Sequence, residues 1–134
     1  MKILIRLAAV LLATGHLSLR ADDAKAILGV WKGGMPGDPP GSIELTISPT
    51  MITGRNSRTG ESLGEGTYEL DPVKKTIDAL RTQKGGRGTK YWGLYSLDGK
   101  TLKWVSTSRG KKRPVDLVHR PERDQFLMIL ERQR

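Results

Sequence analysis

The feature that most constrains this chain is the rhythm of its apolar residues after position 26. Short apolar runs recur about every ten residues, and turns rich in glycine, proline or aspartate separate them. The chain contains 16 Gly and 7 Pro, and no long stretch follows a helical period. This pattern predicts an all-β sandwich or barrel made of short antiparallel strands. The expected strands span residues 27–33, 42–48, 51–56, 64–71, 75–81, 89–97, 101–107, 114–119 and 125–132.

Several of these runs alternate between apolar and polar residues. In residues 42–48, isoleucine and leucine alternate with Glu44 and Thr46, which predicts one buried and one wet face in an antiparallel meander. Residues 89–97 and 125–132 are apolar on both faces. We expect these two strands either to be central or to have an outer face covered by another segment or by a second copy.

The strand count and the turns refine the expected architecture. Nine strands is an odd number, whereas an up-and-down barrel that closes antiparallel needs an even one. We therefore expect either that one predicted strand is half of a bent strand, with residues 42–48 and 51–56 as the first candidate pair, or that the barrel closes imperfectly. The dipeptide Asp98-Gly99 predicts a tight hairpin, and residues 22–26 predict a helical turn before the first strand.

The first 21 residues predict export. Lys2 and Arg6 precede an apolar stretch at residues 7–13, and Ala21 precedes an acidic pair, which is the pattern of a signal peptide. A membrane anchor needs about 20 continuous apolar residues, and this run is shorter. Cleavage after Ala21 is expected, with cleavage after Gly15 as the alternative. The remaining domain, residues 22–134, would be periplasmic or secreted.

Composition limits the chemistry of the exported domain. Cleavage after Ala21 leaves 20 basic and 14 acidic residues, a net charge of +6 compared with +9 for the whole chain. The chain has no Cys, which excludes disulfides, cysteine metal sites and thiol catalysis. Export argues against nucleic acid as a partner and leaves anionic polysaccharides, phospholipid headgroups or small anions.

Two ends of the domain carry a pattern that resembles a known superfamily. Gly29 and Trp31 form a Gly-x-Trp on the first strand, and Arg132 ends the last strand. This arrangement resembles the calycin pattern of lipocalins and fatty-acid-binding proteins. The resemblance implies that the first and last strands meet and that the Arg132 guanidinium covers the Trp31 indole.

A more specific resemblance covers residues 28–132. The motifs that carry it are, in order, "GTYELDP", "KTID", "GLYSLDGKTLKW", "GKKRP" and "LMILER". With these motifs the chain resembles an uncharacterised family of small exported proteins that is abundant in planctomycete bacteria. The resemblance implies a lipocalin-like barrel with no established activity. This chain departs from the family pattern at Val105, where a Cys is frequent, and at Lys100, where an Asp is usual.

Catalytic patterns are sparse. His119 is the one histidine after the signal peptide, and a metal centre needs several converging ligands. Glu65 with Glu69, or Asp71 with Asp78, leaves a carboxylate pair for hydrolysis open. We otherwise expect no enzyme activity, no metal and no cofactor. Asp78 has two further interpretations: a solvent-facing residue of an amphipathic strand, or a structural carboxylate inside the barrel that pairs with Arg113 or a ligand.

The basic loops suggest where a ligand would bind. Residues 79–97 and 101–115 contain no acidic residue. Because alternate connections of a meander leave the same end, the loops at 56–62, 82–89 and 108–113 should share one basic rim, and barrel mouths are common ligand sites. The alternative is that these charges are solvated loop residues and that the neighbouring aromatic residues belong to the core. The residues expected to bind a ligand are Arg81, Lys84, Arg87, Lys90, Tyr95, Trp104, Arg109, Lys111, Lys112 and Arg113.

The sequence therefore predicts a non-enzymatic exported binding module for a small amphiphile or anion at a basic barrel rim. The alternative is a structural or protein-interaction module of the cell envelope, in which side chains fill the barrel. The residues expected to have structural roles are Gly29, Trp31, Asp78 and Arg132. The sequence leaves the ligand and the oligomeric state open.

Overall fold

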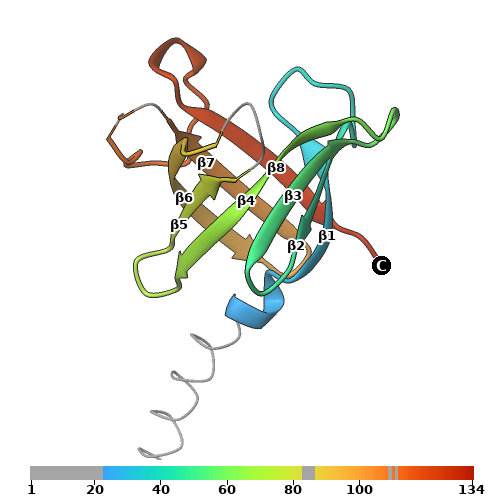
Figure 1. Cartoon of the computed structure of the whole chain (residues 1–134), viewed down its shortest axis with the longest axis horizontal. Helices are drawn as coiled ribbons and strands as arrows, with labels where there is room; N and C mark the ends of the chain where they lie inside the picture. The colour runs from blue at the N-terminus through green and yellow to red at the C-terminus, as the bar shows by residue number, and fades with distance from the viewer. Residues whose placement is uncertain (1–22, 83–86, 109, 111) are drawn as a thin grey trace, which may run out of the picture.

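Eight antiparallel strands close into one barrel in the computed structural model of the chain, which describes residues 23–82, 87–108, 110 and 112–134 (Figure 1). Each strand pairs with the next one in sequence, and the last pairs back with the first. The predicted all-β, lipocalin-like, up-and-down barrel is confirmed. The strands are β1 (Gly29–Gly34), β2 (Ile43–Ile47), β3 (Met51–Asn56), β4 (Ser62–Asp71), β5 (Thr76–Arg81), β6 (Lys90–Asp98), β7 (Thr101–Thr107) and β8 (Phe126–Arg132).

The predicted ninth strand at residues 114–119 is wrong. Local side-chain bonds engage the backbone on and beside this segment, which is why it does not extend the sheet. The Val118 carbonyl accepts from Gln125 Nε2 at 2.7 Å, and the ring of His119 accepts from the Leu127 amide at 3.0 Å. Val115, one of the alternating apolar residues, is 91 % exposed. The suspected bent strand is also wrong, because β2 and β3 are separate, paired strands.

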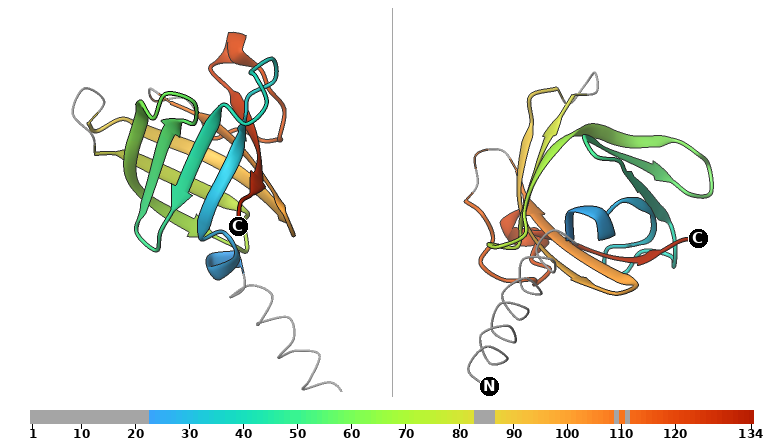
Figure 2. Two further views of the ribbon diagram at one scale, coloured as in Figure 1. Left: turned by 90° about the vertical axis from the view of Figure 1, so that its right-hand side faces the viewer. Right: turned by 90° about the horizontal axis from the view of Figure 1, so that it is seen from below.

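A helical turn at residues 23–26 closes one end of the barrel, as predicted (Figure 2). Ile27, directly after the turn, is fully buried, and its carbonyl accepts from Trp31 Nε1 at 2.9 Å. The Arg132 guanidinium lies 4.3 Å from the centre of the Trp31 ring and donates to the Leu28 carbonyl at 3.0 Å. The meeting of β1 and β8 under this guanidinium agrees with the calycin-like pattern.

Interior side chains form layers between the two ends of the barrel. Successive inward positions of β5 are Ile77, Ala79 and Arg81, and those of β7 begin with Leu102 and Trp104. The layer nearest the helical turn is solidly packed. The core residues there are Ile27, Trp31, Ile47, Ile77, Tyr95, Leu102 and Leu130.

The segment between β7 and β8 folds back along the outside of the barrel. It contains the short 3-10 helix η1 (Pro121–Arg123). Arg113 in this segment lies 5.4 Å from the ring centre of Trp92, on β6, so another part of the chain covers an outer apolar residue of that strand. Among the described residues no helix is long and apolar enough to cross a membrane.

Candidate functional site

The barrel end opposite the helical turn opens into a cavity of about 580 Å³. The connections that follow β1, β3, β5 and β7 leave the barrel at this end, as the meander order requires. The volume lies within the range of about 300–1,000 Å³ that is usual for small-molecule sites. The apolar side chains that line the cavity are Met35, Ile43, Leu45, Ile52, Leu63, Ala79, Leu80, Tyr91, Trp104 and Met128.

Trp104 forms part of the deep wall. Its indole packs against Gly93 of β6, where an added Cβ would lie 2.6 Å from Trp104 Nε1 and 2.5 Å from the Ile77 carbonyl oxygen. Trp104 is 6 % exposed, and its Nε1 has no hydrogen-bond partner among the described residues. The glycine at position 93 therefore leaves room for the close approach of the Trp104 indole nitrogen to β6.

Arg81 is one of two arginines that line the cavity, and it is the half-buried one, whereas Arg58 is exposed. Its Nη2 donates to the Leu63 carbonyl at 3.1 Å, and its Nη1 lies 3.5 Å from the Tyr91 hydroxyl. Its Nε is buried and has no hydrogen-bond partner among the residues that the structure describes. Within the part of the chain that the structure describes, no carboxylate lies within ion-pair distance of Arg81. The acceptors that its terminal nitrogens meet, a backbone carbonyl and a tyrosine hydroxyl, are both neutral.

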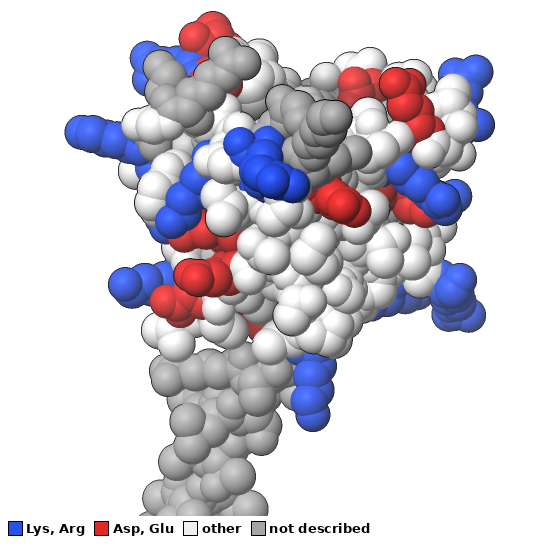
Figure 3. Space-filling view, viewed as in Figure 1, with Lys and Arg blue, Asp and Glu red and all other residues white. Residues whose placement is uncertain are grey.

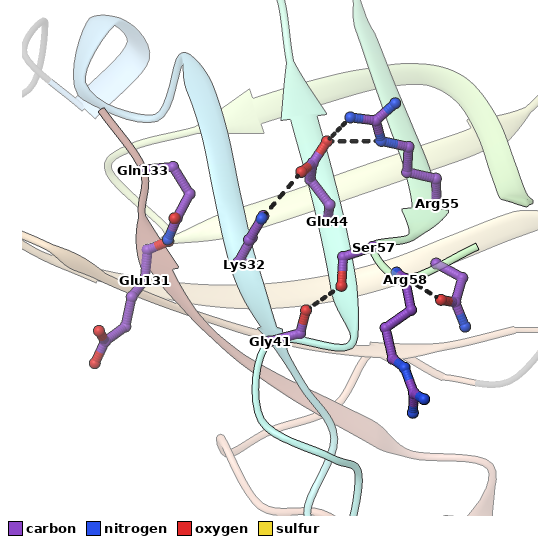
Figure 4. Close-up of polar contacts among 9 residues, drawn as sticks. Lys32, Gly41, Glu44, Arg55, Ser57, Arg58, Glu131 and Gln133 are labelled. Atoms are coloured by element: carbon purple, nitrogen blue, oxygen red, sulfur yellow. Dashed lines mark hydrogen bonds and ion pairs between the residues drawn. The ribbon is translucent and has the colours of Figure 1, made fainter. Parts of the chain in front are cut away.

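The connections at the mouth are tied to each other by polar contacts. Ser57, after β3, donates its hydroxyl to the Gly41 carbonyl, and its amide donates to the Ser42 carbonyl at 2.9 Å. On the outer face nearby, Glu44 accepts from Arg55 Nε at 2.7 Å (Figure 4). Figure 4 also shows Lys32 approaching Glu44, with Nζ 3.7 Å from Oε2. These contacts join the connection after β1 to the connection after β3, and they link β1, β2 and β3 on the outer face.

The charge of the mouth is mixed rather than uniformly basic. Asp38 and Glu65 line the cavity together with Arg58 and Arg81. Lys, Arg, Asp and Glu also intermingle on the face of the molecule shown in Figure 3. Residues 79–97 and 101–115 contain no acidic residue, but the fold places acidic residues from other parts of the chain beside them at the mouth.

The residues predicted to bind a ligand divide into groups with different positions. Arg81 and Trp104 line the cavity. Arg87 and Lys112 are exposed, and Lys90 lies over the outward-facing ring of Trp92, 4.0 Å from its centre. Three predicted residues fall outside the described part of the chain: Lys84, Arg109 and Lys111.

Tyr95, which was predicted to line the site, lies at the closed end of the barrel. Its hydroxyl donates to Asp23 Oδ2 at 2.8 Å, and Lys75 Nζ lies 2.6 Å from the same oxygen. Burial, together with the hydrogen bond to Asp23, raises the pKa of Tyr95 well above its usual range. This contact anchors the helical turn to β6.

Arg113 and Asp78 form a structural pair on the outside of the barrel, not at the rim. Arg113 Nη1 and Nη2 contact the two Asp78 carboxylate oxygens at 2.5 and 2.8 Å. β5 and β6 pair at Thr76↔Leu94 and again at Ala79↔Tyr91, with no paired positions between them. In this gap the Gly93 amide donates to Asp78 Oδ1 at 3.3 Å, and the Gly93 carbonyl accepts from Arg113 at 2.9 Å. The pair thus bonds to the β6 backbone at a gap in the β5–β6 register.

The pKa of Asp78 reflects this environment. Burial acts to raise it, but the hydrogen bonds from Arg113 and from the Gly93 amide outweigh burial and hold the pKa below its usual range. The predicted pairing of Asp78 with Arg113 is confirmed, and the predicted position inside the barrel is wrong. The outward direction follows from the alternation in β5, where Ile77 and Ala79 face the core.

Sequence reasoning missed the side chains and glycines that shape the site. Gly64 and Leu63 bring the β4 backbone to Arg81, and nothing local in the sequence marks that contact.

Among the described residues, no group of three His, Asp or Glu side chains could hold a metal ion. The fold and the cavity define the class of this protein: a small up-and-down barrel with one closed end and one end that opens into an apolar cavity. No family model, no curated protein and no solved structure matches the chain.

Proposed function

We propose that this protein is a non-enzymatic binding module that takes a small amphiphile into the cavity at the open end of its barrel. The observation that carries the proposal is the cavity itself, about 580 Å³ in volume and lined mainly by apolar side chains. Removing apolar ligand surface from water favours binding by about 25 cal/mol per Å² before association costs. The closed opposite end makes the cavity a one-mouthed pocket.

The cavity supports this function over the filled-barrel alternative, which requires side chains to occupy the whole interior. The mixed charge at the mouth gives less support to binding of a bare anion on the rim. Asp78, one of the carboxylates considered for hydrolysis, is engaged by Arg113, so no catalytic step forms part of the proposal. Export of the domain through residues 1–21, to the periplasm or the medium, remains part of it.

A matched pair of substitutions tests the proposal. Ser106 lines the cavity from β7, whereas Ser96 lies on β6 directly after the inward-facing Tyr95 and so faces outward. The neutral probe N-phenyl-1-naphthylamine should show saturable fluorescence enhancement with the wild type and with Ser96→Phe. Ser106→Phe, which puts a ring into the cavity, should weaken binding by roughly tenfold or more, a loss of about 1.4 kcal/mol per decade.

Folding of each variant is checked by circular dichroism and by its thermal midpoint. Equal probe affinity in wild type and Ser106→Phe would show that the cavity is not the binding site. A wild type that leaves the probe fluorescence unchanged would refute the proposal outright.

A further inference from the structure

From the position of Arg81 we infer that the ligand is an anionic amphiphile and that the Arg81 guanidinium receives its acidic head group. This inference rests on the proposed function, because it assigns the chemistry of the molecule that the cavity would hold. It also commits to an orientation: head at Arg81, near the mouth, and tail against the deeper wall.

The first step is the place of Arg81 in the sheet. Arg81 ends β5, and its partner Gly66 gives the last register pair between β4 and β5 at this end. β4 begins at Ser62, so its first residues run beyond the end of β5. The Arg81 side chain reaches across this seam to the Leu63 carbonyl. The guanidinium thus occupies the part of the wall where the regular β4–β5 pairing has ended.

The second step is the seat of the guanidinium. An added Cβ at Gly64, whose φ is +147°, would lie 3.1 Å from Arg81 Nη2 and 3.2 Å from its Cζ. Glycine therefore leaves the space into which the planar group fits. Arg132 has a similar seat at the closed end, where a Cβ on Gly29 would lie 3.4 Å from its Nη1. At each end of the barrel, an arginine guanidinium therefore packs against the backbone of a glycine.

The third step is the difference between these arginines. Arg132 covers the buried Trp31 and donates to backbone carbonyls, and it does not line the cavity at the open end. Arg55, Arg113 and Arg120 each pair with a carboxylate. Arg58 also lines the cavity, but it is exposed, whereas Arg81 is half-buried. Arg81 lines the cavity, has a buried Nε without a partner, and meets no carboxylate among the described residues. Its positive charge is therefore available to pair with an anionic group of a molecule that enters the cavity.

The fourth step is the chemistry of that molecule. A cation at an apolar wall gains most from an anion brought to it out of water, because charge-assisted hydrogen bonds are about twice as strong as neutral ones. The donors of a guanidinium match the oxygens of a carboxylate or phosphate. From Arg81, the apolar wall continues to Ala79, Leu45 and Trp104. An acidic head with one aliphatic tail meets both requirements.

The test compares decanoate with 1-decanol, which share a tail and differ in the charge of the head. Affinities are measured by displacement of N-phenyl-1-naphthylamine. The wild type should bind decanoate roughly tenfold or more tightly than 1-decanol, the range expected for hydrogen bonds to a charged group. Arg81→Gln should lose this preference and keep its affinity for 1-decanol. Arg81→Lys should keep a reduced preference.

The matched control is Arg87→Gln. Arg87 is exposed and bonds to the Thr82 carbonyl at 3.3 Å, so the variant removes the same charge near the same end without touching the cavity wall. It should keep the wild-type preference. A preference that survives in Arg81→Gln overturns the inference and leaves the proposed function standing. A wild type that binds neither molecule overturns both.

A second measurement uses the wild type alone and does not depend on the folding of a variant. Decanoate labelled with ¹³C at its carboxyl carbon is titrated with acid in the complex. The pKa of the bound carboxyl should lie below that of free decanoate, because the adjacent guanidinium favours the charged form. A bound pKa equal to or above the free value would mean that the head does not meet Arg81, since burial alone raises it.

Discussion

Replacing Arg132 with methionine should open the closed end of the barrel. Methionine keeps the unbranched apolar stem of the arginine side chain and removes the guanidinium. That group lies 4.3 Å from the centre of the buried Trp31 ring. It also donates to the carbonyls of Leu28 and Ala26, in the segment that plugs the barrel. The substitution therefore acts on the contact that joins β8, β1 and the N-terminal turn.

The size of the loss follows from these contacts. Hydrogen bonds from a charged donor are worth about 1.5–3 kcal/mol each, and a cation over an indole adds about 0.5–2 kcal/mol. Because the contacts share one group, they do not add fully. We expect Arg132→Met to lower the free energy of unfolding by about 3 kcal/mol, which corresponds to a fall of roughly 10 °C in Tm.

Urea unfolding followed by tryptophan fluorescence measures this loss. Arg134→Met is the matched control, because Arg134 is exposed two residues further along and its loss should change stability by less than about 0.5 kcal/mol. A loss below about 1 kcal/mol for Arg132→Met, or equal losses for the two variants, would refute the role given to Arg132.

Two further predictions concern the β5–β6 seam. A double-mutant cycle with Asp78→Asn and Arg113→Met should give a coupling free energy of about 1–2 kcal/mol at pH 7. The pKa of Asp78 is lower in the folded protein than in the unfolded chain. The stabilisation is therefore present above about pH 4 and should fade as the pH falls through the folded pKa. Coupling that is equal at pH 7 and at strongly acidic pH would contradict the pairing. Gly93→Ala should cost about 1–3 kcal/mol, since the new methyl would collide with the Ile77 carbonyl and the Trp104 indole; a thermal midpoint like that of the wild type would show that the close packing is wrong.

The sequence predicted the strands well because their signals are local. Alternation and turn residues depend on neighbours in the chain, so the starts and ends of the eight observed strands fall within two residues of the predicted ones. The tight hairpin predicted at Asp98-Gly99 forms one residue later, because Asp98 pairs with Thr101 and the two turn residues are Gly99 and Lys100. The closure by Trp31 and Arg132 was also predicted, from a resemblance in a pattern that spans the domain.

The parts that depend on distant contacts were harder to predict. Residues 114–119 alternate like a strand, but they bond to distant groups instead of to a strand ladder. The Gln125 side chain donates to the Val118 carbonyl, and the Leu127 backbone amide donates to the ring of His119. Arg113 has the charge expected of a rim residue, but Asp78 holds it outside the barrel. The charge of Arg81 is visible in the sequence. That no described carboxylate pairs with it depends on where the other strands bring their acidic residues.

The most direct test of the central claim is native mass spectrometry of the wild type and Ser106→Phe, each purified from the organism that makes the protein. The cavity that Ser106 lines should hold its natural ligand through gentle purification. We expect the wild type to carry the additional mass of a small amphiphile that denaturation releases, and Ser106→Phe to have the mass of the bare chain. The same adduct on both proteins, or bare chains for both, would contradict the account.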